Sequence, residues 1–117
     1  MIDFKSFNKL VEYTLIWKEE TGLNEDIMVD DGGSYKSWGH EPVLLVRNST
    51  DPLDKEYVPI LISDDPKVLD YGIEVRISDS DMSKAFRFVE ENRELLMKLA
   101  DEEIDHMEFL TNMVKLK

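Results

Sequence analysis

Four short apolar runs in the middle of the chain constrain its fold more than any other feature. Three are continuous, at residues 26–30, 42–46 and 57–62, and the fourth, 73–77, alternates apolar with polar residues. Runs of this length, bounded by Gly, Pro, Asn and Asp, are typical of β-strands. The alternation also indicates a strand with one buried and one solvated face, which favours an antiparallel sheet. We therefore predict a small antiparallel sheet of about four strands.

The third run contains a proline, Pro59, which limits where that strand can lie. Proline has no N–H to donate to a neighbouring strand, so it is found mainly in edge strands. We expect the strand at 57–62 to lie at an edge of the sheet or to turn the missing donor outward. Residues 63–71 combine acids and a proline with a short apolar pair, and we expect a loop there with one helical turn at most.

Helical periodicity replaces the strand pattern in the last third of the chain. The stretch 78–81 offers several N-caps, and apolar residues then recur every three or four positions over 82–100 and again over 104–114. A single helix would exceed 30 residues, well above the usual length of about 11 or 12. We therefore expect a break near Ala100, with the acidic triplet 101–103 at the start of the next helix.

A second helical pattern covers residues 4–19, where apolar side chains form a wide stripe. Its members are Phe4, Phe7, Leu10, Val11, Tyr13, Leu15 and Trp17. Asp3 can cap this helix and Gly22 can end it. We expect the helix, but the β-branched residues around Thr14 also suit a strand that begins near Glu12.

The predicted order is thus a helix, four strands and one or two helices, within 117 residues. Two independent cores would each be marginal at this length, so residues 1–117 are expected to form one domain. Strands followed by helices indicate the α+β class. We predict a twisted antiparallel sheet of about four strands, with the N-terminal helix and the C-terminal helices packed on it.

The charge of the chain argues against several classes of partner. There are 26 acidic and 14 basic residues, for a formal net charge of −12. Nucleic acids and anionic membranes are bound through basic patches, so neither is expected as a direct partner. The N-terminus does not resemble a secretory signal and no window of 18 apolar residues is present, so we expect a cytoplasmic protein.

Catalytic motifs are absent from the sequence. It contains no cysteine, which excludes thiol catalysis, disulfides and thiolate zinc sites. The phosphate-binding glycine loops and the nucleophile elbow are also missing. Carboxylates are too numerous for any pair to be singled out as acid and base. No cofactor is expected.

The two histidines, His40 and His106, could still bind a metal together with carboxylates. Glu102 and His106 lie four residues apart, as Asp101 and Asp105 do, which would place each pair on one helix face. Such spacing also arises by chance in a chain with 26 acids. A carboxylate/His metal-dependent enzyme is therefore an alternative and not the main expectation.

Two segments are candidates for contact with another protein. The first is the loop 32–42, which contains Tyr35, Trp38 and His40 among glycines. Aromatic side chains in loops are frequent contact anchors, although they can equally cover the edge of a core. The second is the acidic stretch 79–108, with ten acids and four bases. Its representatives are Glu91, Glu94 and Glu102.

The acidic stretch has two interpretations. A solvated acidic helix surface aids solubility. Spaced carboxylates can also imitate a phosphate backbone and occupy the basic cleft of another protein, as inhibitors of the immunity or antitoxin type do. We expect a non-catalytic protein-interaction module that binds another protein, a basic one if the acidic stretch makes the contact. The nucleic-acid mimic or immunity/antitoxin-type inhibitor is the first alternative, and no oligomeric state is predicted.

Overall fold

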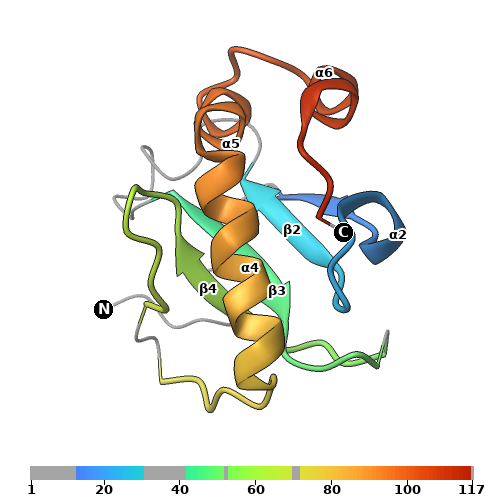
Figure 1. Cartoon of the computed structure of the whole chain (residues 1–117), viewed down its shortest axis with the longest axis vertical. Helices are drawn as coiled ribbons and strands as arrows, with labels where there is room; N and C mark the ends of the chain where they lie inside the picture. Colours follow the sequence, from blue (N-terminus) through green and yellow to red (C-terminus); the bar gives the residue numbers. More distant parts are fainter. Residues whose placement is uncertain (1–12, 31–41, 52, 70–71, 117) are drawn as a thin grey trace.

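A computed structural model describes residues 13–30, 42–51, 53–69 and 72–116. Four strands of this part of the chain form one antiparallel sheet, accompanied by helices (Figure 1). The strands are β1 (Tyr13–Ile16), β2 (Ile27–Asp30), β3 (Val43–Arg47) and β4 (Tyr57–Leu61). The helices are α2 (Lys18–Thr21), α4 (Asp79–Glu91), α5 (Arg93–Ala100) and α6 (His106–Asn112). The predicted α+β class and four-stranded antiparallel sheet are confirmed.

The strands lie in the sheet in the order in which they occur in the chain, β1-β2-β3-β4. Each is antiparallel to the next. In the register, Ile27 of β2 lies opposite Val46 of β3, and Leu45 of β3 lies opposite Pro59 of β4. The strands predicted at 26–30, 42–46 and 57–62 are thus correct to within a residue or two.

Pro59 lies in an edge strand, as predicted, because β4 is the last strand of the sheet. The Leu69 N–H donates to the Pro59 carbonyl at 3.0 Å, and the Leu61 N–H donates to the Lys67 carbonyl at 2.9 Å. The backbone groups of Pro59 therefore face away from β3, since the N–H and C=O of one residue share a side in an antiparallel strand. The absence of an N–H at Pro59 therefore costs the β3–β4 pair no hydrogen bond.

The prediction of a strand at 73–77 is wrong, because this segment lies outside the sheet. The reason is the buried side chain of Asn48. Its Nδ2 donates to the Glu74 carbonyl at 2.7 Å, and its Oδ1 accepts from the Arg76 N–H at 2.8 Å. A side-chain amide thus takes the backbone groups that a neighbouring strand would use.

The prediction of a helix over 4–19 is wrong in its last part, where residues 13–16 form β1 and α2 begins only at Lys18. The strand alternative around Thr14 is the one that the structure has. Ile16 is fully buried opposite Ile27, and this cross-strand burial outweighs the helical periodicity. Residues 4–12 lie outside the described residues. Gly22 does end a helix, with a φ of 84° at the C-cap of α2.

The C-terminal helices break after Ala100, as predicted, and they also break at Asn92. The prediction that residues 101–103 open the next helix is wrong. Glu102 adopts a φ of 61°, and the N–H of Glu103 bonds to the Lys98 carbonyl, so the triplet closes α5. The cap of α6 is Asp105, whose Oδ1 accepts from the Glu108 N–H at 2.8 Å.

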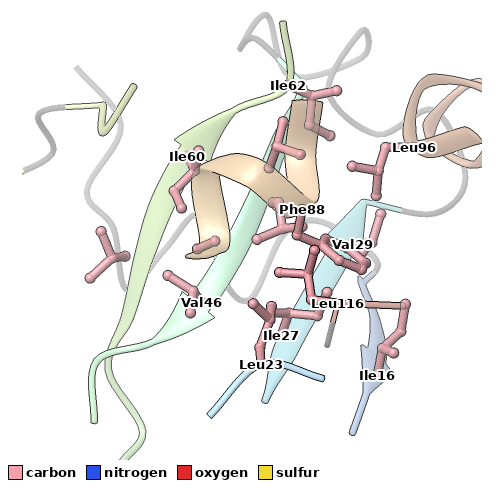
Figure 2. Packing of buried hydrophobic residues seen from close by; sticks show 14 of the residues in the cluster. Ile16, Leu23, Ile27, Val29, Val46, Ile60, Ile62, Phe88, Leu96 and Leu116 are labelled. Atoms are coloured by element: carbon pink, nitrogen blue, oxygen red, sulfur yellow. The ribbon is translucent and has the colours of Figure 1, made fainter. Parts of the chain in front are cut away.

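Helix α4 crosses one face of the sheet (Figure 1), and its Phe88 points into the main core (Figure 2). Three of the buried core residues come from α5 and α6, namely Leu96, Leu99 and Phe109. The C-terminal segment runs from α6 back to α2 and places Leu116 beside the strands (Figures 1 and 2). The predicted packing of C-terminal helices on the sheet is thereby met.

The opposite face of the sheet is buried as well. Val43, Leu45 and Tyr57 form a second cluster there, against which Met28 and Leu69 pack. Strand β3 is therefore buried on both faces, which explains why its run is continuously apolar.

Candidate functional site: an acidic surface on the C-terminal helices

The structure places three of the predicted contact residues on one continuous stretch of chain. Glu91 is the last residue of α4, Glu94 lies in the first turn of α5, and Glu102 follows α5 in the connecting loop. All three side chains are exposed. The other three predicted contact residues, Tyr35, Trp38 and His40, lie outside the described residues.

The break between α4 and α5 is organised by Asn92, which is only 2% exposed. Its Nδ2 donates to the carbonyls of Phe88 and Val114, both at 3.1 Å. Its Oδ1 accepts from the Val114 N–H at 2.7 Å. One buried side chain thus fixes both the kink and the C-terminal segment.

A shallow hollow of about 360 Å³ lies at this kink and carries three carboxylates. Its lining residues are Glu90, Glu91, Asn92, Arg93, Glu94 and Leu95. The cation among them, Arg93, is paired with Asp64 at 2.7 Å. The charge of Arg93 is therefore balanced outside the hollow, and the carboxylates keep a negative potential.

A second hollow, of about 400 Å³, lies in the loop between α5 and α6. It is lined by Glu102, Glu103, Ile104, Asp105 and Glu108. The two hollows lie at the two ends of α5, a helix of eight residues and hence about 12 Å in length. We call the exposed acids of both hollows the acidic surface: Glu90, Glu91, Glu94, Glu102, Glu103, Asp105 and Glu108.

Helix α5, which lies between the two hollows, is held in place by packing against the core. Leu96, Leu99 and Ala100 on the inner side of α5 are fully buried in the core. Residues 90–108 contain eight acids and two bases, and Arg93 is one of those bases. Carboxylates gathered at both ends of a packed helix place many negative charges close together, so this arrangement suits recognition of positive charge.

The predicted metal-ligand geometry is not present. Residues 101–105 form a loop, so Glu102 and His106 do not share a helix face, and neither do Asp101 and Asp105. Among the described residues, no three or more His, Asp or Glu side chains come together in a way that could hold a metal ion. The two predicted pairs do not form because no helix covers residues 101–105.

The sequence did not lead us to two buried ionisable features, of which Glu25 is the more unusual. Glu25 is 1% exposed, and burial, together with the neighbouring Asp81, raises its pKa to about 8. A signal was available in the chain. Leu23, Glu25 and Ile27 follow one another at a spacing of two, and the two apolar members belong to the main core.

The second missed group is the buried ion pair between Arg47 and Asp26, with Nη2 and Oδ2 at 3.5 Å. The Asp26 carboxylate also accepts from the Lys18 N–H at 2.9 Å, at the start of α2. The Arg47 guanidinium lies 5.1 Å from the centre of the Tyr57 ring. This cluster joins α2, β3 and β4 and is explained by that structural role.

Comparisons with protein-family models, with characterised proteins and with solved structures found no match to this chain. Within the residues that the structure describes, no helix has the length and apolar character needed to cross a membrane.

Proposed function

We propose that this protein acts by binding another protein through its acidic surface, without catalysing a reaction. The observation that supports the proposal is the placement of seven exposed carboxylates around two hollows, one at each end of α5. A surface of this kind selects partners with a matching basic patch and penalises acidic ones.

The charge of the whole chain reinforces the effect of this surface. A net charge of −12 attracts a basic partner over a distance of about one Debye length, roughly 8 Å at physiological salt. Association should therefore be fast at low salt and slower as salt rises. The narrower form of the proposal is an acidic mimic, which occupies the basic cleft of a nucleic-acid-binding protein as an immunity or antitoxin-type inhibitor does.

The sequence also gave rise to two other predictions, an aromatic contact loop and a metal-dependent enzyme. The loop with Tyr35, Trp38 and His40 remains a second predicted contact region. The carboxylate/His metal-dependent enzyme remains an alternative only through His40, which lies outside the described residues, because the helix face that was to unite Glu102 and His106 is interrupted by a loop.

The proposal can be tested by affinity capture with three baits. The first is the wild type, and the second neutralises part of the acidic surface with Glu91→Gln, Glu94→Gln and Glu102→Gln. The third is a control with the same change of net charge at exposed acids elsewhere, Glu19→Gln, Asp65→Asn and Glu74→Gln. Bound proteins are eluted with rising salt and identified by mass spectrometry.

A basic protein held by the wild type and the control, but not by the surface variant, is the expected result. Equal capture of that protein by all three baits would contradict a role for the acidic surface. A partner lost only when Tyr35, Trp38 and His40 are replaced by alanine would place recognition in the aromatic loop instead.

A further inference from the structure

A pair of carboxyl groups joins two parts of the fold that are distant in sequence. Glu25 lies in the segment between α2 and β2, and Asp81 lies in the first turn of α4. The side chains of Glu25 and Asp81 form a hydrogen bond with each other. Two ionised carboxylates have no proton with which to form that bond, so it forms only while one of the two is protonated.

The surroundings of each group indicate which one holds the proton. The Glu25 side chain is fully buried, and its Oε2 has no hydrogen-bond partner among the described residues. A charge there would leave an unpaired ionised oxygen in the core. Asp81 is only partly buried, and its Oδ1 accepts from Asn24 Nδ2 at 2.7 Å. The proton therefore belongs to Glu25 and the negative charge to Asp81.

The charges around the pair agree with this assignment. The charged groups that act on Glu25 are Asp81 and Lys84, both on α4. Burial is the main cause that raises the pKa of Glu25, and the hydrogen bond and charge of Asp81 add to it. The hydrogen bond from Glu25 is the main cause that lowers the pKa of Asp81. The interaction between the two carboxyl groups thus raises the pKa of Glu25 and lowers the pKa of Asp81.

We propose that the proton shared by Glu25 and Asp81 is a pH-sensitive latch, which holds the first turn of α4 against the segment between α2 and β2. The latch is closed while Glu25 is protonated. It weakens as the pH rises, because opening then releases the Glu25 proton to water. The side chain of Asn24, in the same segment as Glu25, also contacts α4, because its amide donates to the Asp81 carboxylate.

The sign and size of the pH effect follow from linkage. In the open state the pKa of Glu25 returns to its ordinary value of 4.5, whereas in the closed state it is about 8. Between these two values the closed state keeps a proton that the open state has lost. The ratio of open to closed molecules should therefore rise about tenfold for each pH unit in that range, and level off above it.

Amide hydrogen exchange of the whole chain tests the latch directly. Base-catalysed exchange of an amide already rises about tenfold per pH unit, so exchange through latch opening should rise about a hundredfold between pH 6 and 7. This doubled slope is expected for the backbone amides of residues 23–26 and 82–85. In Glu25→Gln, the slope should return to tenfold. Glu90→Gln, at an exposed position of the same helix, is the control and should keep the doubled slope.

Two results would overturn the proposal. A tenfold slope at all of these amides in the wild type would show that no proton is released on opening. A doubled slope that persists in Glu25→Gln would assign the proton to another group. A carbon-13 NMR titration of the Glu25 carboxyl in the wild type adds a test that needs no variant: a midpoint near 8 is expected, and one near 4.5 would contradict the shared proton.

Discussion

Replacing Glu25 by Gln should stabilise the protein at neutral pH, although the substitution changes a buried side chain. The folded state must hold a proton on Glu25 up to a pH of about 8, while the unfolded chain releases it near 4.5. Each pH unit in this interval costs about 1.4 kcal/mol of the free energy of unfolding. The cost accumulated at pH 7 is about 3 kcal/mol, because 2.5 pH units separate 7 from the ordinary pKa of 4.5. Glutamine keeps the shape and a donor toward Asp81, and it needs no proton.

The assay is urea denaturation of the wild type and Glu25→Gln at several pH values between 5 and 8.5. The free energy of unfolding of the wild type should fall relative to that of the variant by about 1.4 kcal/mol per pH unit up to about pH 8. Groups that the substitution does not affect contribute equally to both proteins and cancel in the difference. Two curves that run parallel across this range would show that Glu25 does not hold its proton in the folded state, as would a variant that is less stable at every pH.

Other predictions concern the hydrogen bonds of Asn92 between α4 and α5, and the close contact of Gly22 with the C-terminal segment. Asn92→Ala should lower the free energy of unfolding by about 2–4 kcal/mol, because buried backbone groups lose their partners. Asn112→Ala, which removes one exposed bond, is the control and should cost less than about 0.5 kcal/mol. Gly22→Ala should cost well over about 1 kcal/mol, since its Cβ would lie 1.9 Å from a carbonyl oxygen of the C-terminal segment. Gly72→Ala has a similar φ, with no atom within 4 Å of the new Cβ, so it should show only the backbone cost of about 1 kcal/mol. Urea denaturation checks both pairs, and equal losses within a pair would contradict the contacts assigned to Asn92 and Gly22.

The sheet could be predicted from the sequence where burial and local pattern agree. The run at 42–46 is apolar throughout because β3 is buried on both faces, and Pro59 indicated the edge because a missing donor restricts a strand in any fold. The segment 73–77 has the pattern of a strand, yet its backbone bonds to the side chain of Asn48, 26 and 28 residues away in the chain. No local pattern reports such a contact.

Of the candidate site, the exposure of the predicted acids could be inferred from the sequence, but their arrangement in space could not. The exposure of Glu91, Glu94 and Glu102 follows from their charge, and it needed no knowledge of the tertiary structure. Their arrangement around two hollows depends on the kink at Asn92, whose partner lies 22 residues further along the chain. Glu25 was missed because the chain contains 26 acidic residues, and only its spacing between Leu23 and Ile27 distinguishes this buried acid from the exposed ones.

Recognition of a basic partner by the acidic surface can be measured through the kinetics of association. The association rate constant of the captured partner would be measured at several salt concentrations with the wild type, the Glu91/Glu94/Glu102 glutamine variant and the Glu19/Asp65/Glu74 control. We predict a rate that falls steeply with salt for the wild type and the control, and a slower rate with a weaker salt dependence for the surface variant. The same rate and the same salt dependence for all three proteins would contradict this prediction.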